Sequence, residues 1–167
     1  MQNNVEKKRN IKIRFDNEND VSVLKNKNVH ADFYLDSYLE VFVMNNNKWV
    51  FLFSTTIHST IVIELNQLLI KLHKTGKKQV LDTFGNANVY IFNKAGENLL
   101  ITNFDKFSNK EEWLYSFDFM EFTKAYTKEL RRYLRAMVME EADIMKRPNF
   151  VLLSQGLLEL EDIVQGK

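Results

Sequence analysis

Three acidic residues near the N-terminus have the spacing that opens a calcium-binding loop. Asp16, Glu18 and Asp20 lie at i, i+2 and i+4, the positions of the first ligands in an EF-hand. That loop also needs a glycine at its sixth position and a glutamate at its twelfth, which binds the ion through both carboxylate oxygens. Here those positions hold Val21 and Lys27. We therefore interpret the acidic residues as a turn rather than a calcium site.

The histidines are the other side chains that could bind a metal or act as a general base. His30, His58 and His73 have no second ligand three or four residues away, and the chain has no cysteine. A zinc site without thiolates would need several such groups. No phosphate-binding glycine loop and no Gly-x-Ser-x-Gly nucleophile elbow is present. We therefore predict no catalytic residue, metal or cofactor, and an enzyme without a local signature stays an alternative.

The strongest functional candidate is a band of positive charge. It consists of Lys124, Lys128, Arg131, Arg132 and Arg135. All but Arg132 lie at i, i+4, i+7 and i+11 and so share one face of a helix. Such a row of cations could meet an acidic protein or the phosphates of a nucleic acid. The alternative is a solvated face, with Glu121–Lys124 and Glu129–Arg132 as pairs within the helix. The acidic stretch 140–143 that follows argues against a long nucleic-acid track.

Aromatic side chains of one strand are the second candidate. Tyr34, Tyr38 and Phe42 fall on the same face of a long strand predicted over 31–44. Exposed aromatic residues are frequent anchors of protein interfaces. The same side chains could instead lie beneath a helix, but the charged residues between them disfavour full burial. We list all of these residues, from the band and from the strand, as candidate partner-binding residues.

Strand and helix patterns must position these side chains. Strands are predicted over 11–15, 21–24, 31–44, 48–55, 80–82, 89–92 and 99–102, with 113–117 as a further strand or the beginning of a helix. Asn45, Asn46 and Asn47 join the two long strands. An apolar stripe predicts a helix after these strands, and Gly76 is a natural end for it. The stripe consists of Ile61, Leu65, Leu68, Leu69 and Leu72.

Two more helices are predicted towards the C-terminus. The longer runs over about 119–146, with a break near 139–142, and the chain's single proline, Pro148, ends it. The tail, about 154–164, forms a short helix. The predicted fold class is therefore α+β, an antiparallel sheet with the order β-β-β-β-α-β-β-β-α-α and helices packed on it. From the third strand onward this order is similar to that of the longin and profilin-like folds, an analogy of element order alone.

Composition limits the remaining possibilities. The chain has 167 residues, of which 45% are hydrophobic, enough for one domain with its own core. We predict a disordered segment over 1–10 and a single domain over 11–167. The formal net charge of +1 gives no global field that would attract nucleic acid or membrane. No signal peptide and no apolar run near 20 residues is visible, so we expect a cytoplasmic protein without a membrane partner.

These observations favour a non-enzymatic module that binds one protein partner. An immunity-type or antitoxin-like inhibitor, or a chaperone, would need this profile of stable scaffold and exposed charge. A homodimer is compatible with the same features. Two alternatives stay open: a nucleic-acid-binding regulatory protein that uses the basic helix, and an enzyme or small-molecule sensor with a pocket between sheet and helices.

Overall fold

The computed structural model describes residues 11–16 and 35–167, and it shows an α+β fold with two antiparallel sheets. The strand orders are β1-β2-β3 in the first sheet and β4-β5-β6-β7 in the second. The strands are β1 (Ile13–Asp16), β2 (Leu39–Asn45), β3 (Lys48–Thr55), β4 (Gln79–Asp82), β5 (Asn88–Ala95), β6 (Asn98–Asp105) and β7 (Lys110–Asp118). The helices are α2 (His58–Thr75), α3 (Phe119–Glu140) and α4 (Pro148–Gln165), with a 3-10 helix, η2 (Ala142–Lys146), between the last two.

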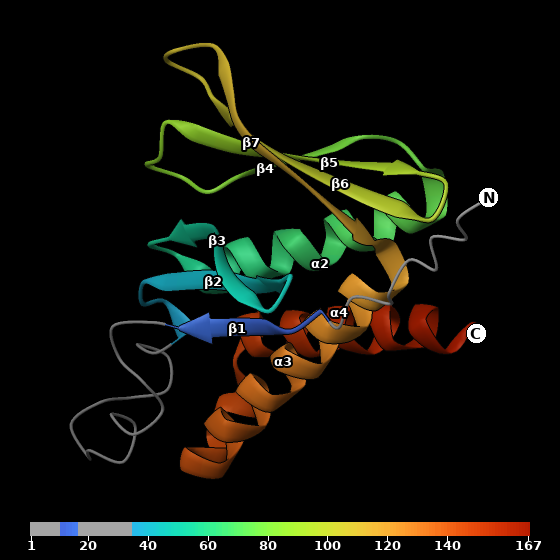
Figure 1. The fold of residues 1–167 in the computed structure, drawn as a ribbon. Helices are drawn as coiled ribbons and strands as arrows, with labels where there is room; N and C mark the ends of the chain where they lie inside the picture. The colour runs from blue at the N-terminus through green and yellow to red at the C-terminus, as the bar shows by residue number, and fades with distance from the viewer. Residues whose placement is uncertain (1–10, 17–34) are drawn as a thin grey trace.

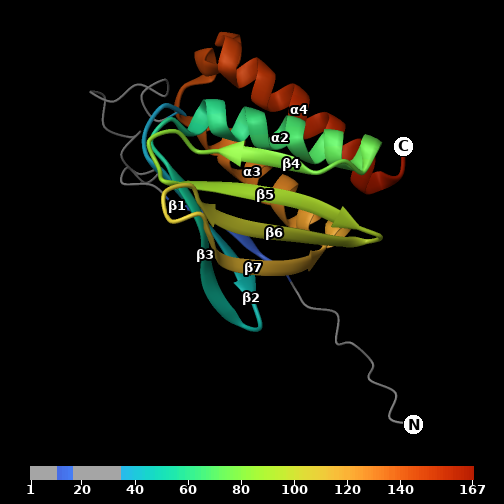
Figure 2. The same ribbon diagram turned by 90° about the horizontal axis from the view of Figure 1, so that it is seen from above.

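The helices form the middle and lower layers of the molecule in Figure 1. The four-stranded sheet lies above α2, while α3 and α4 lie below it, and α4 packs on both α2 and α3. The three-stranded sheet is joined to α3 through β1, where the Phe15 N–H donates to Glu129. Seen from above, the β2–β3 hairpin projects beyond β7 (Figure 2). None of the helices described is both long enough and apolar enough to cross a membrane.

The helix predicted from the apolar stripe that begins at Ile61 is confirmed as α2. α2 buries all five members of that stripe, and it ends at Gly76 with φ of 64°, whose N–H donates to the Leu72 carbonyl. Glycine reaches this left-handed conformation without a steric penalty from a Cβ atom. The inward faces of both sheets complete the core around α2 and α3. Its largest fully buried rings are Tyr126, Phe53, Phe92, Phe119 and Phe122.

The hairpin between the two long predicted strands is present, but its first strand is shorter than expected. Asn46 and Asn47 form a two-residue turn with φ of 49° and 61°, a twist that matches the twist of paired strands. Residues 35–37 do not continue β2, because the Ser37 carbonyl accepts a hydrogen bond from His58 and Asp36 accepts one from Ser59. The chain therefore bends around the start of α2, and the prediction of a strand at 35–37 is wrong.

The break predicted near 139–142 is confirmed, and it divides the helix predicted over about 119–146 into α3 and η2. α3 ends at Glu140, η2 follows, and Pro148 opens α4 instead of ending the preceding helix. Proline fits the first turn of a helix, because its missing N–H would have no partner there. The tail helix consequently begins at Pro148 rather than near 154.

The strands after α2 differ from the longin and profilin-like analogy in number and arrangement. Four strands, not three, follow α2, because 110–118 is a strand and not the beginning of a helix. They form a sheet of their own instead of joining β1, β2 and β3 in one sheet. The predicted strand 21–24 lies outside the described residues. The analogy therefore holds for the α+β class and fails for the sheet.

One glycine determines how closely α4 approaches α2. A Cβ atom at Gly156 would lie 2.7 Å from Nδ2 and 2.9 Å from Cβ of Asn66. Asn66 is buried in α2, and its Oδ1 accepts a hydrogen bond of 2.7 Å from the Tyr126 hydroxyl. Its Nδ2 has no hydrogen-bond partner among residues 11–16 and 35–167. This contact fixes the position of α4, and with it the space between α3 and α4.

Candidate functional site

Strand alternation directs a set of large side chains to the outside of the three-stranded sheet. Leu39, Val41 and Val43 of β2 are buried, so Phe42 between them faces outward. A bulge between Val41 and Phe42 changes the register with β3 and places Phe51 opposite Phe42. We call the resulting surface the aromatic face. It consists of Arg14, Phe42, Trp49 and Phe51.

Arg14 is at the centre of the aromatic face. Its guanidinium carbon lies 4.6 Å from the ring centroid of Phe42 and 5.0 Å from that of Trp49, within the range of cation–π attraction. Phe42 and Phe51 make an edge-on contact with centroids 5.5 Å apart. The Arg14 side chain also forms a weak ion pair with Asp16, at 3.8 Å. Its Nε is buried and has no hydrogen-bond partner in the described part of the chain.

The aromatic face is nevertheless open to solvent. Trp49 is 40% exposed and Phe51 is 42% exposed. Large rings and arginine are the residues that most often carry binding free energy at protein interfaces. The arrangement therefore has the composition and the fixed geometry of an interface anchor.

Of the two predicted aromatic candidates that the structure describes, only Phe42 belongs to this face. Phe42 lies on it, while Tyr38 precedes β2 and donates a hydrogen bond of 3.3 Å to Glu40. Tyr34 lies outside the described residues. The sequence reasoning did not identify Arg14, Trp49 or Phe51. The two-residue asparagine turn pairs Met44 with Trp49 and was a usable signal, whereas no local pattern signals the pairing of β1 with β2.

The structure divides the predicted basic band on α3. Arg131 makes a two-pronged ion pair with Glu161 of α4, with Nε to Oε1 at 2.6 Å, and this contact raises the pKa of Arg131. Arg132 contacts Glu129 at 2.8 Å and 2.6 Å, which confirms that predicted pair. Glu129 is itself buried against β1. Both arginines are therefore joined to carboxylates of the fold.

The other three cations of the band stay exposed. Lys124, Lys128 and Arg135 have no ion pair with any described residue, so the predicted Glu121–Lys124 pair does not form. They extend along the exposed side of α3. The band is thus reduced from five available cations to three.

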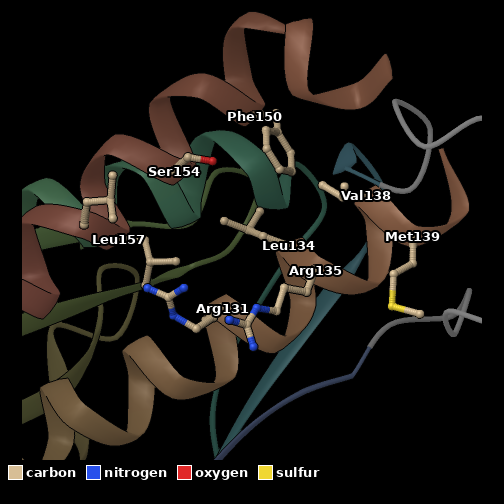
Figure 3. A pocket seen from close by; sticks show the side chains of 9 residues that line it. Arg131, Leu134, Arg135, Val138, Met139, Phe150, Ser154 and Leu157 are labelled. Atoms are coloured by element: carbon tan, nitrogen blue, oxygen red, sulfur yellow. The ribbon is translucent and has the colours of Figure 1, made fainter. Parts of the chain in front are cut away.

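A groove of about 430 Å³ lies between α3 and α4. Its lining comes from both helices, as Figure 3 shows. The lining residues are Arg131, Leu134, Arg135, Val138 and Met139 of α3 and Phe150, Ser154, Leu157 and Leu158 of α4. Polar groups are few and lie mainly on the α3 wall. The groove is therefore a mostly apolar surface with positive charge along one side.

His58 is held inside the fold at the start of α2. His58 is 1% exposed, with Nδ1 2.6 Å from the Ser37 carbonyl oxygen and Nε2 2.9 Å from the Tyr133 hydroxyl. Burial lowers the pKa of His58 to about 4, against the smaller raising effects of the Ser37 hydrogen bond and the Asp36 charge. Nδ1–H therefore donates to Ser37, and Nε2 accepts from Tyr133.

The two remaining metal-site candidates that the structure describes, His73 and Asp16, belong to different elements, α2 and β1. His73 stacks on Phe119 with ring centroids 6.0 Å apart, and His30, Glu18 and Asp20 lie outside the described residues. Asp16 is exposed beside Arg14. Within 11–16 and 35–167, no three side chains of the metal-binding types gather.

Comparison with known proteins adds no assignment to this geometry. No protein-family model, no curated protein and no solved structure matches the chain. Function must therefore be inferred from the surface chemistry of the chain itself, in particular from the aromatic face and from the groove between α3 and α4.

Proposed function

We propose that this chain is a protein-binding module whose main contact surface is the aromatic face. The observation that supports it most is the position of Arg14 over two rings, Phe42 and Trp49, on a surface where the rings are still partly exposed. Such a cluster is held in place before any partner arrives. Preorganised side chains lose little conformational entropy on binding, so more of their interaction free energy contributes to affinity.

The chemistry of the aromatic face indicates what the partner presents. Trp49 and Phe51 offer apolar area for an aliphatic or aromatic side chain. The Arg14 side chain is 42% exposed, so its guanidinium can donate to a carboxylate or carbonyl of a partner. The partner is thus a protein with an apolar residue flanked by a hydrogen-bond acceptor.

A dedicated inhibitor of the immunity or antitoxin kind, or a chaperone, is the class of binder that fits this surface. Such proteins act by covering one partner and need no reaction centre. We place the module in the cytoplasm, in keeping with its lack of cysteine. Self-association through the same face would make the partner a second copy of the chain.

The alternative functions have less support. A nucleic-acid binder would use the basic band, but Arg131 and Arg132 are already paired with Glu161 and Glu129. A small-molecule sensor would use the groove, whose volume lies within the usual range for ligand pockets. That groove is open along its side, however, whereas small-molecule sites enclose most of the ligand surface.

The proposal can be tested by comparing capture by two variants of the full chain. The tagged protein is incubated with lysate of its own cells, with nuclease and at two salt concentrations. Trp49→Ala should lose a captured protein that the wild type retains, because truncation of an interface anchor typically weakens binding by about 30-fold or more. Phe107→Ala is the matched control, since Phe107 is 88% exposed on the β6–β7 turn, outside the aromatic face.

Affinity measured with the isolated partner completes the test. Equal affinity of the wild type and Trp49→Ala would contradict the proposal, as would capture of nucleic acid in place of protein. A steep loss of nucleic-acid binding with salt would then favour the basic band.

A further inference from the structure

The groove between α3 and α4 has an apolar floor and exposed apolar rims. Leu134, Phe150 and Leu157 are buried at its base, each less than 10% exposed. Met139 is 86% exposed and Leu158 is 58% exposed at its edges. Exposed apolar side chains beside a hollow mark a surface that gains free energy when another molecule covers it.

The charges along the groove are not symmetric. Arg131 is joined to Glu161 across the two helices and so closes one end of the groove. Arg135, one turn further along α3, lines the same wall and makes no ion pair with any of the described residues (Figure 3). Lys128 and Lys124 continue this row beyond the groove. The α3 wall therefore offers fixed positive charge to whatever lies in the groove.

The length and the walls of the groove favour a helix as the occupant. Arg131 to Met139 spans about 12 Å along α3, roughly two helical turns. Both walls are helices, whose backbone groups are paired within each helix apart from the ends. An extended peptide would find few backbone partners there, whereas a helix satisfies its own backbone hydrogen bonds.

We propose that this groove binds an amphipathic helix of a protein partner, with its apolar stripe on Leu134, Phe150 and Leu158 and with carboxylates facing Arg135. The argument for this partner is charge complementarity with the basic α3 wall, together with an apolar floor of matching length. Met139 is well suited to such a site, because its flexible thioether adapts to different side chains. This surface is distinct from the aromatic face, so each can fail without the other.

The test uses a designed peptide as the probe. A fluorescein-labelled helix of about 15 residues, roughly 22 Å long, carries leucines at i, i+3, i+4 and i+7 and glutamates beside them. A second peptide has lysine in place of each glutamate. Anisotropy titrations of the full chain should show binding of the glutamate peptide and about tenfold weaker binding of the lysine peptide.

Variants locate the binding to the groove. Arg135→Glu should reverse the preference between the two peptides, and Leu158→Glu should remove binding of both. Matched controls are Lys71→Glu, an exposed cation of α2, and Leu152→Glu, an exposed apolar residue of α4 outside the groove lining. Both controls should bind the glutamate peptide as the wild type does, and so should Trp49→Ala.

Several results would overturn the proposal. Absence of binding to either peptide, equal binding of both peptides, or an equal loss in Leu158→Glu and Leu152→Glu would each do so. Displacement of the glutamate peptide by laurate at lower concentration would identify a small amphiphile as the occupant. A dimer in sedimentation equilibrium that Leu158→Glu dissociates would identify a second copy of the chain.

Discussion

The start of α2 and the aromatic face both gather polar and aromatic side chains, but they differ in whether those groups have partners. His58 is almost fully buried, and both of its ring nitrogens contact hydrogen-bonding groups of the chain. Arg14 lies over two aromatic rings, but its Nε has no hydrogen-bond partner within the described residues. Trp49 beside it is 40% exposed. Groups with partners inside the chain stabilise the fold, whereas partly exposed rings and a partly exposed guanidinium are still accessible to another molecule.

The largest expected effect is the pH dependence of the free energy of unfolding that buried His58 causes. The folded-state pKa of His58, about 4, lies below its ordinary value of 6.5. Between these values the unfolded chain binds a proton that the folded chain does not, so the free energy of unfolding falls as pH falls. The loss is roughly 3 kcal/mol from pH 6.5 to pH 4, at about 1.4 kcal/mol per pH unit. Above pH 6.5 this contribution is constant.

Urea unfolding at a series of pH values checks this prediction. His58→Asn keeps a donor near the Ser37 carbonyl but does not titrate, so the difference in stability between wild type and variant should shrink as pH falls. His73→Asn is the control on the same helix, because His73 is exposed. A parallel pH dependence of wild type and His58→Asn would show that His58 is not the titrating group.

The next effect tests whether α4 is held by the close contact at Gly156. Gly156→Ala should lower the free energy of unfolding by about 2 kcal/mol, because the new methyl group overlaps Asn66 and the helices must move apart. The exposed neighbour Gln155→Ala is the control and should have almost no effect. Adding Asn66→Ala to Gly156→Ala should recover part of the loss. An unchanged midpoint in urea for Gly156→Ala would mean that α4 adjusts freely.

The sequence predicted the helices and hairpins that depend on residues close together in the chain. The leucine stripe and Gly76 identify α2, and the asparagine turn identifies the β2–β3 hairpin, because both depend on neighbouring residues. Pro148 was ambiguous, since proline both ends one helix and fits the first turn of the next. The division of the strands into two sheets depends on contacts between distant segments, which no local periodicity records.

The candidate sites show the same limit. The band on α3 was visible from helical spacing, but its reduction to three free cations depends on Glu161, thirty residues after Arg131. Phe42 was identified from strand alternation, whereas Trp49 and Phe51 join it only through hairpin register and a bulge. Arg14 joins them through the pairing of β1 with β2, two strands that lie far apart in the sequence. Sequence reasoning therefore found one member of the aromatic face and missed its centre.

The smallest expected effect is a change in the free energy of unfolding, and it shows whether Arg14 of the aromatic face stabilises the fold. Arg14→Met should change the free energy of unfolding by only about 0.5 kcal/mol, the range of an exposed cation–π contact, because methionine still covers the rings. Lys12→Met is the matched control, because Lys12 is an exposed cation that shortly precedes Arg14 in the chain. The measurement is urea unfolding of both variants. A loss above about 2 kcal/mol in Arg14→Met would place Arg14 with the stabilising groups such as His58, since such losses accompany buried polar groups deprived of partners. A small loss in stability together with weaker capture of the partner would instead separate binding from folding at this residue.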